Sequence, residues 1–300
     1  MITMSFICNF PLCSQIVIIG MSFYQLRSVL VKAIIYNNHQ LFAAGEWEKM
    51  SLNRGLFFGE SPFTTLKLSD GVFEALEFHL RRLSRSIYFL WNVDFKDFEE
   101  SLLKGLKELY EESGDFYFRI TFVKTLNEEV DFFIYKLPFE NKEGDLNLEI
   151  SKVIRGRTNI PNYLKVGNYL EYSLELREKK CSELVYFNFE NELLECGTSN
   201  IFLVKDEKVL TPALIPGILD GVTRHLLLDF LRAENLSVRE CSLSLEDLKN
   251  SDEIWLTNGL RGIRAASSLS GEDLSNKLLL KINEKFKKFV RNYGEATARG

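Results

Sequence analysis

Apolar residues recur along the first half of the chain at two kinds of spacing. In residues 70–90 they lie three or four positions apart, as on one face of a helix, and they are Phe73, Leu76, Leu80, Leu83 and Ile87. Residues 97–114 show the same spacing in their leucines, and Gly114 is expected to end that helix. Residues 115–124 are rich in aromatic and β-branched side chains, which is typical of a strand. An earlier pair of apolar runs around an Asn-Asn turn, within residues 28–46, predicts a hairpin.

The second half of the chain also alternates between strands and helices. A helix is expected just after Lys165. Further strands are predicted at 183–196, 200–214 and 252–259, and a further helix at 223–236. The strand at 252–259 is the last one that the pattern indicates. The polar, charged stretch 139–149 is the expected linker between an N-terminal α+β domain at 21–138 and a C-terminal domain at 150–300. We therefore expect an α+β fold of two domains, with any small-molecule site at their junction.

Composition narrows the functional classes. The 300 residues are 46% hydrophobic, enough for a packed core, and the net charge of −5 is spread evenly, which argues against a nucleic-acid partner. The five cysteines are scattered without a Cys-x-x-Cys pair and the three histidines form no cluster, so we expect a reducing, cytoplasmic setting and no metal. Residues 1–20 fit neither a signal peptide nor a membrane span, because they hold polar residues and no positive charge. They are expected to be a disordered leader, or to precede a true start at Met21.

Three local features suggest chemistry, although each has an ordinary structural explanation. Gly221 precedes a helical pattern whose first amides, at Val222 and Thr223, can bind an anion, but it is also a common loop-to-helix junction. Glu195 ends a strand and is either solvated or placed to hold a protonated ring nitrogen. Arg82 lies on the helix predicted at 70–90, where most arginines are simply solvated or paired.

Five short motifs nevertheless follow one another in a recognisable order. They are His-Leu-Arg-Arg-Leu at 79–83, Lys-x-x-Asn-Tyr-Leu at 165–170, Glu-x-Gly-Thr-Ser-Asn-Ile-Phe-Leu at 195–203, Thr-Pro at 211–212, and Ile-Leu-Asp-Gly-Val-Thr-Arg at 218–224. Together they resemble the class IV aminotransferase and lyase family of pyridoxal-phosphate enzymes (fold type IV), over roughly residues 30–270. The resemblance implies a smaller N-terminal α/β sandwich domain and a larger β-barrel-like C-terminal domain with helices. It also implies a cofactor between the domains and a homodimer.

The resemblance assigns roles at the matching positions. Lys165 resembles the lysine that binds pyridoxal phosphate as a Schiff base and then moves protons, which requires burial or nearby positive charge to keep its amine neutral. Glu195 resembles the residue that contacts the pyridine nitrogen, and Arg82 the phosphate-binding arginine. Lys152, Lys179 and Lys180 are alternatives for the covalent lysine, but only Lys165 is followed by Asn-Tyr-Leu.

The phosphate end of the expected cofactor site has further candidates. Gly221, with the amides of Val222 and Thr223, resembles the family's phosphate cradle. Asn258 and Gly259 occupy the matching loop. Gly259 stands where serine or threonine is frequent, so only its backbone amide is left, and Thr257 is the candidate to supply the missing hydroxyl.

The segment 59–68 bears on which activity the chain has. Its Phe-Thr-Thr, with Thr64 and Thr65, looks like the form found in 4-amino-4-deoxychorismate lyases, whereas the aminotransferases carry a glutamate there. The three-residue spacing from Lys165 to Asn168 is shared by the lyases and the D-amino acid enzymes. The segment 257–266 resembles one common among the lyases.

These features imply a folate-precursor lyase that acts on an anionic amino substrate. The 4-amino group of the substrate would displace Lys165 from the cofactor, and the freed Lys165 amine would take the proton from C4. Loss of pyruvate would then give 4-aminobenzoate. Thr64 or Thr65 would aid proton delivery, and Arg261, Arg264 and Tyr169 would contact the substrate. Two alternatives stay open: a branched-chain or D-amino acid aminotransferase that uses the same lysine, and a protein that serves only as a binding or regulatory module.

Overall fold

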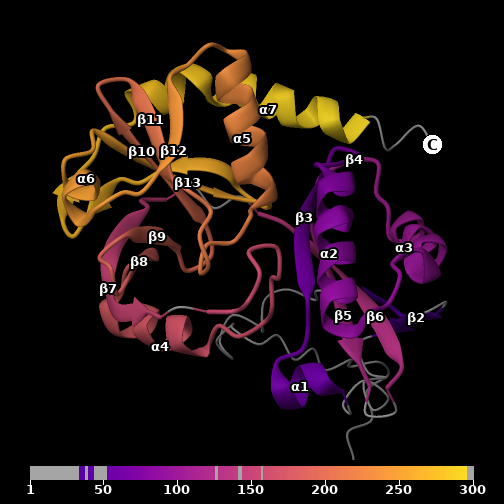
Figure 1. The fold of residues 1–300 in the computed structure, drawn as a ribbon. Coiled ribbons are helices and arrows are strands. Elements are labelled where there is room, and N and C mark those ends of the chain that lie inside the picture. Colours follow the sequence, from indigo (N-terminus) through magenta and orange to yellow (C-terminus); the bar gives the residue numbers. More distant parts are fainter. Residues whose placement is uncertain are drawn as a thin grey trace, which may run out of the picture.

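The first half of the chain forms one antiparallel sheet covered by two helices (Figure 1). The computed structural model describes residues 34–37, 40–43, 53–125, 128–140, 144–156 and 158–295. The six strands lie in the order β2-β1-β6-β5-β3-β4. Their bounds are β1 Ile34–Asn37, β2 Gln40–Ala43, β3 Phe63–Ser69, β4 Val72–Phe73, β5 Asp115–Lys124 and β6 Val130–Pro138. The helices of this half are α1 Arg54–Phe58, α2 Leu76–Trp91 and α3 Lys96–Glu108.

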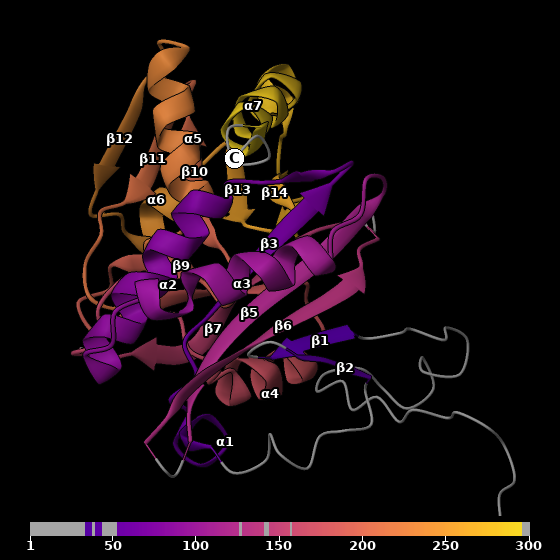
Figure 2. The ribbon, with the colours of Figure 1, turned by 90° about the vertical axis from the view of Figure 1, so that its right-hand side faces the viewer.

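The alternation of side chains along β5 explains how this sheet is covered. Phe118, Ile120 and Phe122 are fully buried and belong to one apolar cluster with leucines of α2 and α3. Figure 2 shows these two helices lying across the sheet. Because successive side chains of a strand point to opposite faces, Tyr117 and Arg119 face away from the helices.

The second half contains two five-stranded sheets. One has the order β12-β11-β10-β13-β14 and the other β16-β15-β7-β8-β9. The strand bounds are β7 Asn147–Arg155, β8 Glu183–Asn188, β9 Leu193–Cys196, β10 Asn200–Lys205, β11 Lys208–Pro212, β12 Val238–Cys241, β13 Glu253–Asn258, β14 Gly262–Ala265, β15 Ser268–Leu269 and β16 Glu272–Asp273. The helices are α4 Leu170–Lys179, α5 Val222–Ala233, α6 Leu245–Lys249 and α7 Lys277–Glu295.

Strand β10 lies between two apolar clusters. Its residues Phe202 and Val204 pack with α5 and α7, whereas Ile201 and Leu203 pack with residues of the other sheet. A strand that is buried on both faces reads as a continuous apolar run, as β10 does.

None of the helices in the described ranges combines the length and the apolar character needed to cross a membrane.

Several predicted elements are confirmed and others need correction. The strand at 115–124 coincides with β5, and the predicted hairpin contains the antiparallel pair β1 and β2. The helix expected over 70–90 begins only at Leu76, because Asp70 and Gly71 adopt positive φ angles of 44° and 77° and form a turn that leads into β4. The helix expected over 97–114 ends at Glu108.

The strand at 252–259 is not the last one, since β14, β15 and β16 follow it. The predicted leader at 1–20 lies outside the described residues. The boundary at 139–149 falls between the last strand of the first sheet and β7, although β7 already begins at Asn147. The division of the chain into two domains there remains our proposal.

Candidate active site

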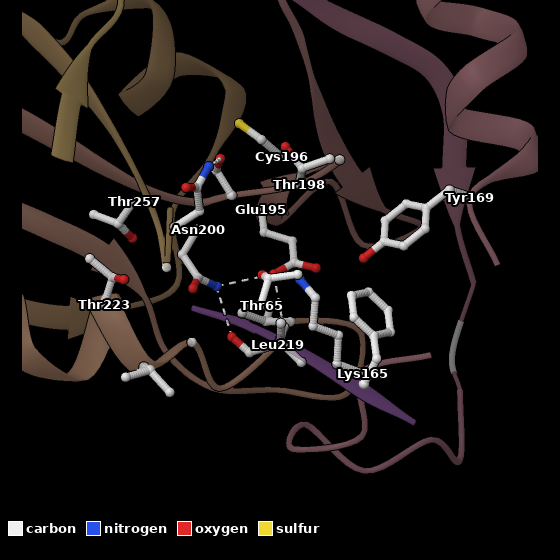
Figure 3. A pocket seen from close by; sticks show the side chains of 18 of the residues that line it. Thr65, Lys165, Tyr169, Glu195, Cys196, Thr198, Asn200, Leu219, Thr223 and Thr257 are labelled. Atoms are coloured by element: carbon white, nitrogen blue, oxygen red, sulfur yellow. Dashed lines mark hydrogen bonds between the residues drawn. The ribbon is translucent and has the colours of Figure 1, made fainter. Parts of the chain in front are cut away.

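A cavity of about 660 Å³ lies between the two halves of the chain. Residues of β3, β5 and α2 line one side, and residues of the second half line the other. Figure 3 shows the Lys165 amine pointing toward the Glu195 carboxylate, with Tyr169 on one side and Thr223 and Thr257 on the other. The cavity therefore brings together side chains that are far apart in the sequence.

The pairing of β3 with β5 determines which side chains of the first half of the chain face the cavity. Thr65 of β3 and Arg119 of β5 are register partners, so their side chains lie side by side on one face of the sheet. Phe63 lies two residues earlier on that face, and the Arg119 guanidinium is 3.6 Å from the centre of its ring. Thr64 points to the opposite face, where α2 packs.

Lys165 lies in the segment between β7 and α4 and is held by its backbone. Its carbonyl accepts a 2.9 Å hydrogen bond from the Phe63 amide, and its amine is 5.2 Å from the centre of the Phe63 ring. Burial lowers the pKa of the Lys165 amine to about 7, with help from the positive charges of Arg82 and Arg119 and against the opposing effect of Glu195. At neutral pH about half of these amines are therefore uncharged.

Glu195 is fixed by three donors. Its Oε2 atom accepts hydrogen bonds from the Leu219 amide at 2.9 Å and from Asn200 Nδ2 at 3.1 Å, and Arg155 Nη1 lies 3.3 Å from Oε1. Asn200 Nδ2 also donates to the Leu219 carbonyl at 2.7 Å. Burial raises the pKa of Glu195, and the positive charge of Arg155 opposes this effect. The carboxylate is thus held in one orientation beside the Lys165 amine.

Arg82 and the start of α5 form the other end of the site. Arg82 is 8% exposed and donates a 2.9 Å hydrogen bond to Thr64 Oγ1. Burial lowers its pKa to about 10, so it stays charged at neutral pH. Helix α5 begins at Val222 without a capping side chain, which leaves its first amides free for an anion.

Two observations indicate that this end of the cavity is built to receive a group. A Cβ atom at Gly221 would lie 2.0 Å from Asn200 Oδ1, so the backbone approaches there more closely than any side chain would permit. Thr257 Oγ1 is buried and has no hydrogen-bond partner within the described ranges. An unpaired buried hydroxyl is costly, and a phosphate at the helix start would satisfy it. These residues fit the phosphorylated cofactor that the sequence resemblance implies.

The cavity contains nearly all of the residues predicted from the sequence. The predicted residues that line it are Thr65, Arg82, Lys165, Tyr169, Glu195, Gly221, Val222, Thr223, Thr257, Asn258, Gly259, Arg261 and Arg264. Thr64 is not among them, because it is fully buried behind the wall with its hydroxyl against Arg82 and His79. Its position favours Thr65 over Thr64 as the residue that can reach a substrate.

Hydrogen bonds of Asn258 hold the loop after β13 in its conformation. Asn258 Oδ1 accepts hydrogen bonds from the Leu260 and Arg261 amides, and its Nδ2 donates to Ser199 Oγ. Asn258 therefore shapes the loop. Arg261 is exposed at the rim, whereas burial lowers the pKa of the half-buried Arg264.

Sequence reasoning did not assign roles to Arg119, Arg155 and Asn200. Arg119 was detectable, because the alternation within 115–124 places it with Tyr117 opposite the most apolar face. Asn200 was detectable as well, since it lies five residues after Glu195 in the same motif. Arg155 meets Glu195 only through the fold, because it is forty positions away in sequence.

Comparison with known proteins now identifies the family. The family model for amino-transferase class IV matches residues 61–269. The chain belongs to this family. As a class IV member it is an enzyme, and the fold-type-IV neighbours below confirm the expected α+β architecture.

Curated relatives of this class IV chain include both lyases and aminotransferases. It is 35% identical over 112 residues to the aminodeoxychorismate lyase of Vibrio harveyi, a match that covers 36% of the chain and only 41% of that lyase. It is 27% identical over 251 residues to the aminodeoxychorismate lyase of Bacillus subtilis, covering 76% of the chain and 83% of the relative. The probable branched-chain-amino-acid aminotransferase of Thermotoga maritima is 28% identical over 227 residues, with 72% and 81% covered.

Solved structures give the same two groups. The aminotransferase from Brucella abortus bound to the cofactor PLP has a TM-score of 0.75 at 20% identity and covers 88% of this chain and 99% of its own. The putative 4-amino-4-deoxychorismate lyase from Legionella pneumophila has a TM-score of 0.66 at 26% identity, with 77% and 93% covered. The class IV fold is thus established, and the choice between its activities depends on the site.

Proposed function

We propose that this class IV enzyme is a pyridoxal-phosphate-dependent lyase that converts 4-amino-4-deoxychorismate to 4-aminobenzoate and pyruvate. The observation that carries the proposal is the cavity between the halves, where the Lys165 amine with its lowered pKa lies beside Glu195 and among several arginines. This arrangement supplies a neutral amine for proton transfer and positive charge for an anionic amino substrate.

Pyridoxal phosphate fits the residues that are present. Lys165 would hold its aldehyde carbon, Glu195 its ring nitrogen, and Arg82, Thr257 and the amides of Val222 and Thr223 its phosphate. When bound, the cofactor supplies an electron sink next to the substrate's amino-bearing carbon. Glu195, tied to the Leu219 amide and to Asn200, keeps its negative charge directed at one point in the cavity.

We assign the proton transfers of the proposed reaction to Lys165 and Thr65. The lowered pKa of Lys165 allows its amine to accept the proton from C4 of the substrate at neutral pH. Thr65 lines the cavity beside its strand partner Arg119, and we propose that its hydroxyl helps to deliver a proton to the leaving enolpyruvyl group. The products are then pyruvate and an aromatic ring.

The arginines of the cavity wall support an anionic substrate. Arg119 is positioned by its contact with the Phe63 ring and by a 3.1 Å hydrogen bond from its Nε to Thr121 Oγ1. We propose that Arg119 and Arg264 pair with the substrate's carboxylates, with Tyr169 close by. Arg261, at the exposed rim, is the weaker candidate.

An amino-group transfer between amino acids and 2-oxo acids is the second candidate activity. The match to the Thermotoga aminotransferase, over 72% of the chain, favours it. It requires the same Lys165 and Glu195 and differs in the groups that meet the substrate. In the family's aminotransferases a glutamate follows the phenylalanine of this segment, whereas here Thr64 follows Phe63, and this supports the lyase.

We further propose that the enzyme is a cytoplasmic homodimer. The three described cysteines are free thiols, which fits a reducing compartment. The homodimer rests on the family resemblance.

Pyruvate release tests the proposed reaction. The enzyme, shown by its visible absorbance to carry the cofactor, is given 4-amino-4-deoxychorismate without any amino acceptor, with Lys165→Ala as the control. Steady pyruvate production by the wild type alone supports the lyase, because an aminotransferase would stop after one turnover. If the loaded enzyme releases no pyruvate, the lyase is excluded and amino donors should be screened.

A further inference from the structure

His79 lies between two hollows near the start of α5. It is 3% exposed on α2 and lines both the cavity of the active site and a second cavity of about 390 Å³. Val222 and Thr223, the first residues of α5, also line both cavities. The chemistry proposed above makes no use of this imidazole.

The contacts of Thr64 determine the tautomer of His79. Arg82 donates to Thr64 Oγ1, which lies 2.6 Å from His79 Nδ1. The fully buried Thr64 hydroxyl needs an acceptor for its own proton, and the described part of the chain offers it none besides His79 Nδ1. Nδ1 therefore accepts, and in the neutral ring the proton is on Nε2. Burial, with the nearby charges of Arg82 and Lys165, lowers the pKa of His79 well below 6.5 and keeps the ring neutral.

The Nε2–H group of His79 has no hydrogen-bond partner in the part of the chain that the structure describes. Within the described residues, the hydrogen bond of this ring is the one at Nδ1. Thr257 Oγ1, which lines the same active-site cavity, is buried and has no hydrogen-bond partner within the described ranges. Together with the uncapped start of α5, these are donors that a phosphate group could satisfy at once.

The lack of a side chain at Gly259 leaves room for the His79 ring. A Cβ atom at 259 would lie 2.7 Å from the Thr65 carbonyl oxygen, 3.0 Å from His79 Cε1 and 3.4 Å from His79 Nε2. The edge of the imidazole thus occupies the space that a serine or threonine side chain at 259 would need. The loop lacks a hydroxyl there, and a ring N–H group lies against it.

We propose that His79 is a positioning residue for the phosphate group of the cofactor, and that its Nε2–H group donates to a phosphate oxygen in place of the hydroxyl that Gly259 lacks. This inference rests on the proposed function, since it assumes a phosphorylated cofactor at the start of α5. The donor is neutral, so it adds a directed hydrogen bond beside the charge that Arg82 supplies.

The test compares the affinity of the apo-enzyme for pyridoxal phosphate with its affinity for pyridoxal, measured by absorbance titration. His79→Asn keeps an acceptor near Nδ1 for the Thr64 hydroxyl but has no atom at the Nε2 position. It should weaken binding of pyridoxal phosphate about ten- to hundredfold, the usual effect of losing a hydrogen bond to a charged group, while pyridoxal changes less than about threefold. His79→Gln, whose amide nitrogen reaches the Nε2 position, should recover most of the phosphate preference.

The outcomes separate this inference from the proposed function. If the wild type does not bind pyridoxal phosphate, the proposed function itself fails. If the wild type binds it and His79→Asn binds it equally well, or loses affinity for both ligands alike, the role of His79 is refuted. Should His79→Asn not fold, His79→Gln decides, because it must prefer pyridoxal phosphate over pyridoxal as the wild type does.

Discussion

The Leu219 amide donates a 2.9 Å hydrogen bond to Glu195 Oε2, which joins the carboxylate to the loop that leads into α5. The two ends of the proposed cofactor site are therefore mechanically connected: the same short loop carries the partner of Glu195 and the start of the phosphate cradle. A change at either residue should be felt at both ends.

Replacing the Glu195 carboxylate by an amide should separate charge from geometry. Glu195→Gln retains an oxygen for the Leu219 amide, so the fold should persist, but it removes the negative charge. We expect turnover to fall on the order of a hundredfold or more, as for the loss of one preorganised electrostatic group. Steady-state kinetics measures this, and a fall of less than fivefold would show that the charge is dispensable.

The lowered pKa of Lys165 should be visible in the pH dependence of its reaction with an aldehyde. Only the neutral amine reacts, so the rate of pyridoxal attachment to the apo-enzyme should rise with pH through a midpoint near 7 rather than near the ordinary lysine value of about 10.4. In Arg82→Met the midpoint should move to higher pH, because a neighbouring positive charge is gone.

Arg81→Met is the matched control for this experiment. Arg81 is the next residue on α2, but its side chain is 63% exposed and pairs with Glu77. Its midpoint should equal that of the wild type. Equal shifts in the two variants would mean that Arg82 does not act on Lys165 through its charge.

The same burial should make Lys165 costly for the stability of the apo-enzyme. Unfolded Lys165 binds a proton below pH about 10.4 and folded Lys165 only below about 7, so wild-type stability should rise with pH between these values. Lys165→Met should increase the free energy of unfolding at pH 7 by on the order of 4 kcal/mol, and this gain should shrink toward pH 10.

Urea unfolding at several pH values measures this effect. Lys152→Met is the control, because the Lys152 side chain is 68% exposed and should change stability by less than about 0.5 kcal/mol. A gain for Lys165→Met that does not vary between pH 7 and pH 10 would contradict the assigned pKa.

Adding one carbon at Gly221 should disturb both ends of the site. The new Cβ atom would meet Asn200 Oδ1 at 2.0 Å and push away the side chain that supports Glu195. We expect Gly221→Ala to lose about 1–3 kcal/mol of stability and to bind the cofactor more weakly. Gly144→Ala, where a Cβ would meet nothing within 4 Å, is the control, and thermal unfolding compares the two.

Substrate recognition should depend more on Arg119 than on Arg261. Removing the charge in Arg119→Leu should raise KM for the anionic substrate about ten- to hundredfold, as expected for a hydrogen bond between charged groups. Arg261→Ala should have a smaller effect, since this side chain is at the exposed rim. An unchanged KM in Arg261→Ala removes it from the candidate contacts, and an unchanged KM in Arg119→Leu would contradict our assignment.

Local sequence patterns predicted some of these elements and missed others for physical reasons. The strand at 115–124 was found because its alternation and aromatic content are strong, and Lys165 because its motif is local. The turn at Asp70 and Gly71 was overlooked, since the helical spacing of apolar residues happens to continue back to Phe73. Helix α7 was detectable from Leu279, Ile282, Phe286 and Val290, which are buried on one face.

The site was harder to predict where it depends on long-range pairing. Thr64 and Thr65 were indistinguishable in sequence, and only the register of β3 against β5 decides which one faces the cavity. The pairing of Arg155 with Glu195, and the exclusion of a side chain at Gly259 by the His79 ring, depend on contacts between segments that no spacing rule relates.

Thr64 and Thr65 point to opposite sides of β3, so substitutions at the two positions should affect different functions of the enzyme. A substitution at 65 alters the surface that a substrate meets, while a substitution at 64 alters the support of Arg82 and His79 on the other side of the strand. Variants with new substrate ranges should therefore carry changes at 65 rather than at 64, and should keep the proposed lyase reaction only where a hydroxyl remains at 65. A laboratory library restricted to position 65 and its cross-strand partner would explore new specificities while leaving cofactor retention intact.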